Sequence, residues 1–174
     1  NAEMRASMST FDSTKTSLSK LLEQIVEGKL QLPDFQRGWV WDDAHIRSLL
    51  VSIARSFPIG SVMLLETGGE SRFQIRLVEG VTLARPVLAE RLILDGQQRL
   101  TSLTQVLKLP QAVKTRDDKK REVERHYYID IEKALTPNSS LDDAIFAVDG
   151  SKTLRSNFGR KIDLDLSTTD KEYD

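Results

Sequence analysis

Apolar residues recur with the 3.6-residue period of an amphipathic helix in three stretches of the chain. The first predicted helix covers residues 17–26, and Gly28 is the expected stop signal after its C-terminus. The second begins at Asp42 or Asp43 and continues to about residue 56, and the third ends before Pro110. We expect the second helix to bury one stripe of side chains, made of Ile46, Leu49, Leu50, Ile53 and Phe57.

Short runs rich in apolar residues predict strands between these helices. The clearest is the run 92–94, three apolar residues that indicate a buried strand. Around Gly68 and Gly69 we expect a β-hairpin whose strands cover 61–66 and 72–77. Further strands are expected at 30–32, 126–131 and 144–148.

The remaining segments show little apolar pattern. Residues 114–125 carry six basic and four acidic side chains, which most simply form a solvated helix face or loop. Residues 151–174 are polar and weakly patterned. The predicted order of elements is α-β-α-β-β-β-α-β-β. This order predicts an α+β fold, a small mixed β-sheet with packed helices.

The composition of the 174 residues, with 39% hydrophobic and 29% charged side chains, suits one globular domain. We expect residues 1–12 to be a tag or disordered N-terminus, 13–150 to form the domain, and 151–174 to extend toward a further C-terminal region. No apolar run reaches the roughly 20 residues of a membrane span. The chain has no cysteine, which excludes disulfides and thiol catalysis and fits a cytoplasmic protein. Its net charge of −1 lacks the basic character of a dedicated DNA-binding domain.

A polar cluster, Asp95-Gly96-Gln97-Gln98-Arg99, lies where a predicted strand ends and the third helix begins. The first turn of a helix offers unpaired N–H groups and the positive end of the helix dipole, so it attracts phosphate. Gly96 admits a ligand close to the backbone, Arg99 supplies a forked cationic donor, and Asp95 is suited to hold Mg²⁺ or orient a water. The alternative interpretation is an ordinary cap and turn with a solvated Arg99.

A second unusual segment contains both tryptophans of the chain, in the order Phe35, Gln36, Arg37, Trp39 and Trp41. In one interpretation the three aromatic rings pack on the core and Gln36 and Arg37 are solvated. In the other, this is a binding loop in which Gln36 and Arg37 face a ligand while the aromatic rings fix the loop or stack on a base.

The chain has only two histidines, His45 and His126, so a histidine-rich metal site or an HNH-type nuclease centre is excluded. Any chemistry would have to come from carboxylate, amide and guanidinium groups, together with a divalent cation. Such groups position water and neutralise charge, which is the main work of phosphoryl transfer.

The two polar segments together resemble the motifs of a known family. The segment PDFQRGWVW at 33–41, followed about fifty residues later by LDGQQRLTSL at 94–103, is similar to the DGQQR-motif domain at the N-terminus of GmrSD-type modification-dependent restriction proteins and related phage-defence proteins. The helix 41–50 and the turn 57–60 also fit the pattern. The resemblance covers roughly residues 17–150 and implies a ParB/sulfiredoxin-like fold.

The resemblance implies binding of a nucleoside triphosphate, its hydrolysis, and a role in restricting invading DNA. The residues that would bind the nucleotide and its phosphates are Gln36, Arg37, Gly96, Gln97 and Arg99. Those that would carry catalysis are Asp95, Gln98 and Arg99, with Mg²⁺ on Asp95. The family often has Tyr where this chain has Phe35 and Trp39, and Phe35 lacks the hydroxyl that would supply a hydrogen bond or proton transfer from that position. The implied partners are DNA, through the full-length protein, and a C-terminal HNH-type nuclease domain, with no membrane.

Two other function classes compete with this hypothesis. One is a ParB-like DNA-binding or nuclease module, against which the near-neutral charge argues. The other is a non-catalytic protein-interaction domain in which Trp39 and Trp41 form the docking surface.

Overall fold

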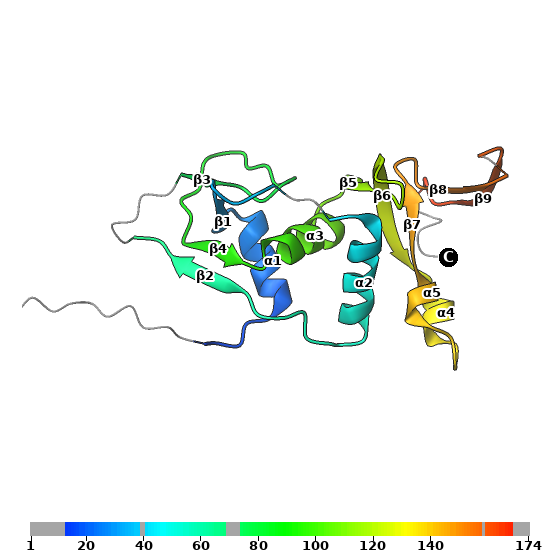
Figure 1. The fold of residues 1–174 in the computed structure, drawn as a ribbon, viewed down its shortest axis with the longest axis horizontal. Helices are drawn as coiled ribbons and strands as arrows, with labels where there is room; N and C mark the ends of the chain where they lie inside the picture. The colour runs from blue at the N-terminus through cyan, green and yellow to red at the C-terminus, as the bar shows by residue number, and fades with distance from the viewer. Residues whose placement is uncertain (1–12, 39–40, 69–73, 158, 169–174) are drawn as a thin grey trace, which may run out of the picture.

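The computed structural model describes residues 13–38, 41–68, 74–157 and 159–168. Within these residues the helices and strands form one mixed sheet, one antiparallel sheet and a separate two-stranded ribbon (Figure 1). This arrangement confirms the predicted α+β class. The expected tag or disordered segment 1–12 lies outside the described residues. None of the helices in the described part of the chain has the length and apolar character needed to cross a bilayer.

The first sheet is mixed and has the strand order β2-β4-β1-β3. The central strands β1 (Leu30–Pro33) and β4 (Arg91–Asp95) run parallel, with Leu30 opposite Arg91. The outer strands β2 (Met63–Glu66) and β3 (Ile75–Arg76) pair antiparallel with β4 and β1, respectively. Because β4 is a central strand that ends at Asp95, it presents the DGQQR cluster at one edge of this sheet.

Two helices, α1 (Leu18–Val26) and α3 (Gln97–Leu107), pack together beside the first sheet (Figure 1). The side chain of Ser17 caps α1 by accepting the backbone N–H of Lys20, as expected for an N-cap serine. The most deeply buried side chains of this core are Leu22, Ile25, Leu30, Leu32, Val78, Ile93, Leu100 and Leu103.

A third helix, α2 (Asp43–Ala54), stands between the first sheet and the antiparallel sheet (Figure 1). The antiparallel sheet has the order β5-β6-β7, formed by β5 (Val113–Arg116), β6 (Glu122–Ile129) and β7 (Ile145–Asp149). The hydroxyl of Tyr127 on β6 donates to Asp43 Oδ1 at 2.9 Å and so ties this sheet to the start of α2. Burial raises the pKa of the Tyr127 hydroxyl, and the Asp43 carboxylate raises it further.

The short helices α4 (Ile131–Leu135) and α5 (Leu141–Ala144) join β6 to β7. After β7, the strands β8 (Thr153–Ser156) and β9 (Lys161–Asp165) form the two-stranded ribbon. The polar segment 151–174 therefore contains a hairpin that its weak apolar pattern did not predict.

The expected hairpin around Gly68 is wrong. β2 pairs with β4 rather than with the following strand, and β3 pairs with β1. Residues 69–73, which include most of the expected turn, lie outside the described residues. Local alternation predicted both strands but not their partners, because pairing with the apolar β4 and β1 depends on contacts distant in sequence.

The expected solvated helix or loop at 114–125 is also wrong, since this segment forms β5, a tight turn and the first half of β6. Exposed and buried residues alternate along it, and most of its charged side chains point outward. The high charge therefore suggested a solvated segment although the two-residue period of a strand was present. The buried stripe predicted for α2 is wrong at one residue, Phe57. Ile46 and Leu49 are buried, but Phe57 is 58% exposed because it lies beyond the helix end, and Val51 is buried instead.

Candidate functional site

The strand-to-helix junction is a sharp turn made by Gly96. Its φ of +87° lies in the left-handed region, which favours glycine, and an added Cβ would come 3.1 Å from Val62 Cγ2. Of the described side chains, none caps α3 at Gly96, so the first turn of α3 has no side-chain cap. The turn therefore ends β4 and begins α3, and the N-terminal end of a helix favours an anionic ligand.

Three glutamines join the segment 36–38 to this junction. Gln36 Nε2 donates to the carbonyl of Leu94 at 2.9 Å and, more weakly, to that of Ile93 at 3.4 Å. In the other direction, the Nε2 of Gln97 donates to the Arg37 carbonyl and that of Gln98 to the Gly38 carbonyl, both at 3.2 Å. We call these contacts the glutamine clasp. The clasp brings together the two polar segments that lie about sixty residues apart in the sequence.

Arg76 on β3 supports the same segment from the other side. Its Nη2 lies 3.4 Å from the carbonyl of Gln36 and 3.5 Å from that of Arg37, and its Nη1 pairs with Glu79 at 2.9 Å. Sequence reasoning missed this residue, which it assigned only to a strand. Nothing local distinguishes Arg76 from a solvated strand residue, because its acceptors lie about forty residues away.

Arg99 is fixed by backbone carbonyls. Nη1 donates to Ile59 at 2.9 Å, Nη2 donates to Ser61 at 2.6 Å, and Asp95 Oδ2 lies 3.8 Å from Nη2. Both ends of the guanidinium fork thus hold the 59–61 turn against the start of α3. Since a guanidinium has five N–H donors, these two bonds leave donors for a ligand as well.

The chemically available groups at the junction are Arg37 and Asp95. The Arg37 side chain is exposed, and in the described part of the chain its guanidinium has no hydrogen-bond or ion-pair partner. The Asp95 side chain is 67% exposed. The three glutamine amides and Arg99, by contrast, are already bonded to backbone carbonyls. The structure thus divides the predicted site residues into a supporting group and an accessible group.

A divalent cation is compatible with this site through a single carboxylate. The described residues contain no group of three or more His, Cys, Asp or Glu side chains able to hold a metal ion. Mg²⁺ is commonly bound by one or two carboxylates together with substrate phosphates and water. The exposed carboxylate of Asp95 fits that pattern, with the phosphates as the other ligands.

The aromatic residues near the site differ in their exposure to solvent. Trp41 is half-buried and packs against the first core, as the packing interpretation expected. Phe35 is 67% exposed, so it is not a core residue. Trp39 lies outside the described residues.

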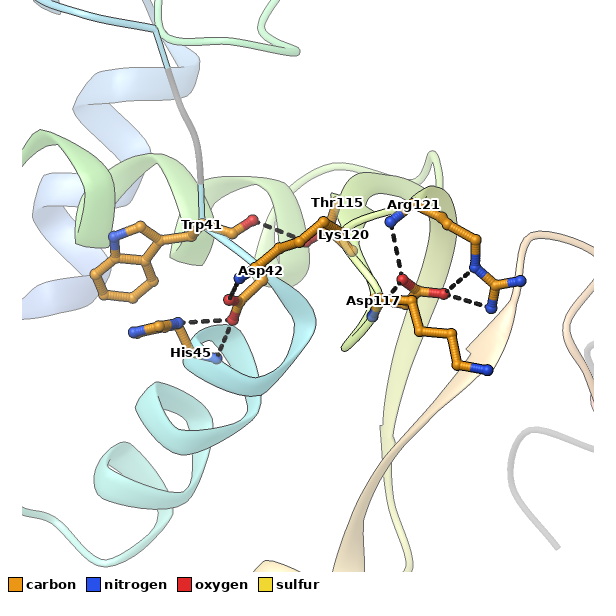
Figure 2. Close-up of polar contacts among 8 residues, drawn as sticks. Trp41, Asp42, His45, Thr115, Asp117, Lys120 and Arg121 are labelled. Atoms are coloured by element: carbon orange, nitrogen blue, oxygen red, sulfur yellow. Dashed lines mark hydrogen bonds and ion pairs between the residues drawn. The ribbon is translucent and has the colours of Figure 1, made fainter.

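The residues at the start of α2 contact the β5–β6 hairpin (Figure 2). Asp42 accepts the backbone N–H and the ring Nδ1 hydrogen of His45, at 3.0 and 2.6 Å, and Lys120 Nζ lies 3.5 Å from its other oxygen. The hydrogen bonds from His45 hold the pKa of the Asp42 carboxyl below its usual value. Thr115 donates to the Trp41 carbonyl at 2.8 Å, which ties the same point to β5.

A comparison with known families finds one family whose model matches most of this chain. The model of the family described as the N-terminal domain of the GmrSD restriction endonuclease matches residues 18–171. The chain belongs to this family. The resemblance that the two polar motifs indicated is therefore confirmed.

An archaeal relative shares part of this sequence. The chain is 30% identical over 140 residues to an uncharacterized protein of Methanocaldococcus jannaschii, and the match covers 76% of the chain. It covers 23% of that relative, so the chain spans about a quarter of the length of this curated protein.

Proposed function

We propose that this chain is a nucleotide-binding domain that hydrolyses a nucleoside triphosphate within a restriction protein. The observation that carries the proposal is the glutamine clasp, which sets the backbone of Arg37 and Gly38 against the uncapped first turn of α3. An exposed cationic side chain, a helix N-terminus and an exposed carboxylate are the groups that triphosphate recognition requires.

The residues divide the work between binding and positioning. Arg37 would neutralise phosphate charge, and the backbone N–H of Gln97 would donate to a phosphate oxygen. Asp95 would hold Mg²⁺, which supplies charge neutralisation at the phosphates. Arg99 would keep the 59–61 turn in place and turn its remaining N–H donors toward the ligand.

Hydrolysis requires a water held in line with the γ-phosphate. The described junction offers the Asp95 carboxylate and the amide oxygen of Gln97 as acceptors for such a water. None of these groups is a strong base near neutral pH, so the proposed catalysis relies on positioning and charge rather than on proton abstraction.

The role of DNA belongs to the longer protein. The chain has a net charge of −1, and strong binding to DNA depends on neutralising several phosphates with basic side chains. We therefore propose that nucleotide binding here regulates a DNA-acting activity located elsewhere, with an HNH-type nuclease domain as the expected partner.

Thermal unfolding with ATP, GTP, CTP or UTP, each with and without Mg²⁺, tests the proposal. A ligand at about 100 times its dissociation constant adds about 2.7 kcal/mol, which raises the melting temperature by several degrees. Arg37→Gln should remove the shift, and the control Arg85→Gln, at another exposed arginine, should retain it. Phosphate-release assays on the same variants test turnover.

Two outcomes would contradict the proposal. An unchanged shift in Arg37→Gln would remove Arg37 from the site. Absence of a shift with all four nucleotides, combined with binding to DNA that weakens steeply with salt, would favour the DNA-binding alternative.

A further inference from the structure

The short edge strand β3 runs beside the segment that carries Arg37. Arg76 of β3 lies opposite Leu32 of β1, and the Gln74 carbonyl accepts the backbone N–H of Asp34 at 2.7 Å. The clasped segment 36–38 follows directly after this pairing. The Arg76 guanidinium therefore starts within reach of the carbonyls of that segment.

The carbonyl of Arg37 is held from two sides. Gln97 Nε2 donates to it from α3 at 3.2 Å, and Arg76 Nη2 donates to it from β3 at 3.5 Å. The same Nη2 donates to the neighbouring Gln36 carbonyl at 3.4 Å. Since a carbonyl oxygen has two lone pairs, it can accept both donors. These contacts fix the backbone of Arg37, while its side chain is exposed.

Arg76 is itself anchored by Glu79. Its Nη1 lies 2.9 Å from Glu79 Oε1, and the two side chains are only 26% and 30% exposed. An ion pair that is largely shielded from water loses less of its attraction to solvent screening than a surface pair. The guanidinium is therefore oriented before any ligand is present.

The turn that contains Glu79 is fixed in its turn to α3. Gln105 Nε2 donates to the Glu79 carbonyl at 3.1 Å. Val78 and Val81, on either side of the turn, are buried in the first core. Glu79 thus offers Arg76 a firm support.

These contacts form a closed circuit that begins and ends on one helix. It runs from Gln97 to the Arg37 carbonyl, then through Arg76 and Glu79 back to Gln105. Along α3, Gln97 and Gln105 are separated by roughly 12 Å. Because both ends of the circuit lie on the same helix, the position of Arg37 is set relative to the N-terminal end of α3. Such anchoring lowers the ordering cost of binding.

A direct contact between Arg76 and a ligand is the alternative role. Both terminal nitrogens of Arg76 already donate to protein acceptors, Nη1 to Glu79 and Nη2 to the two carbonyls. Contact through either nitrogen would compete with these bonds. The geometry therefore favours action through Arg37.

We propose that Arg76 is a positioning residue, which with Glu79 holds the backbone of Arg37 where its side chain meets the phosphates. This inference rests on the proposed function. It assigns to β3, which carries none of the predicted site residues, a part in recognition of the triphosphate.

The first test is the affinity of the chain for inorganic tripolyphosphate with Mg²⁺, a probe that needs no choice of base. Arg76→Gln should weaken binding at least about fivefold. Arg76→Lys keeps the charge but loses the planar fork that reaches Glu79 and the carbonyls together, so it should restore less than half of the lost affinity. It is also the second variant should Arg76→Gln fail to fold. Arg55→Gln breaks another arginine–carboxylate pair, with Asp142 at 2.6 Å, and should leave the affinity unchanged.

The second test needs no ligand. In NMR spectra of the unliganded protein, Arg76→Gln should shift the backbone N–H of Arg37 and the side-chain amide of Gln97, and Arg55→Gln should shift neither. A residue that contributes only to stability would lower the melting temperature without changing the affinity of the folded protein.

Three results would overturn the inference. They are wild-type affinity in Arg76→Gln, an equal loss in Arg55→Gln, and full recovery in Arg76→Lys, which would indicate a direct contact through charge. Absence of tripolyphosphate binding by the wild type would instead contradict the proposed function. The resonances measured without ligand would then still decide whether Arg76 holds Arg37.

Discussion

A Cβ atom at residue 60 would lie 2.2 Å from Nη1 of Arg99. Gly60, with φ of +94°, is therefore the residue that lets the Arg99 guanidinium reach the carbonyls on both sides of it, those of Ile59 and Ser61. The geometry of this contact explains how a residue in the first turn of α3 fixes a loop about forty positions earlier in the chain.

Gly60→Ala should destabilise the protein through this contact. The alanine would meet both an unfavourable φ and the Arg99 side chain, so we expect the free energy of unfolding to fall by about 2–4 kcal/mol. Gly159→Ala is the matched control, because Gly159 has φ of +82° but no atom within 4 Å of the added Cβ. Denaturant unfolding of both variants measures the difference, and equal losses would show that the Arg99 contact adds nothing.

Gln36→Glu should open the glutamine clasp. A carboxylate cannot donate to the Leu94 carbonyl and would place negative charge against it, so we expect a loss of about 1–3 kcal/mol. Gln74→Glu introduces the same charge at an exposed neighbouring position and should change stability by less than about 0.5 kcal/mol. Urea unfolding provides the comparison, and similar values for the two variants would contradict a clasp that contributes to stability.

Asp42→Asn should change how the stability of the protein depends on pH in the acid range. The hydrogen bonds from His45 lower the pKa of Asp42 in the folded state, so this carboxylate stabilises the fold above its ordinary pKa of 3.8. That contribution is lost as the pH falls from 3.8 through the lower folded-state value. Asparagine is an equally good N-cap, so the substitution mainly removes the charge.

The expected measurement is the melting temperature of both proteins between pH 6 and pH 3. The wild type should be the more stable at pH 6, and the difference should shrink below pH 3.8. A difference that stays constant over this range would show that the Asp42 charge is not linked to folding. Figure 2 shows the contacts at stake, with His45 and Lys120 both directed at Asp42.

Asp95→Asn should separate metal dependence from folding. Because the Asp95 side chain is 67% exposed, we expect stability to change by less than about 0.5 kcal/mol. If Asp95 holds Mg²⁺ at the phosphates, wild-type nucleotide binding will be stronger with Mg²⁺ than with EDTA, and the variant will lose that difference. Calorimetric titrations in both conditions test this, and Mg²⁺ dependence retained in the variant would remove Asp95 as the ligand.

Much of this domain was predictable because its signals are local. A few adjacent residues are sufficient to predict the serine cap and apolar face of α1 and the end of β1 near Pro33. The same holds for the turn at Gly96 that joins β4 to α3. The two polar motifs were equally visible, and their combined pattern was sufficient to indicate the family that the comparison confirmed.

The roles within the motifs were not predictable in the same way. A sequence does not show whether Gln36, Gln97 and Arg99 face a ligand or a backbone carbonyl. Only the fold shows that these side chains donate to carbonyls. Arg37 looked no different from Arg76, yet one has no partner in the described part of the chain and the other supports the loop.

The sequence by itself determined where the three long helices begin, which runs are buried and which two segments carry the polar motifs, because caps and periodicity act over a few residues. The tertiary structure decided which strands pair, as with β2 on β4, and which polar groups remain for a ligand. Those outcomes depend on hydrogen bonds between residues forty to sixty positions apart, whose partners are specified only once the whole core has packed.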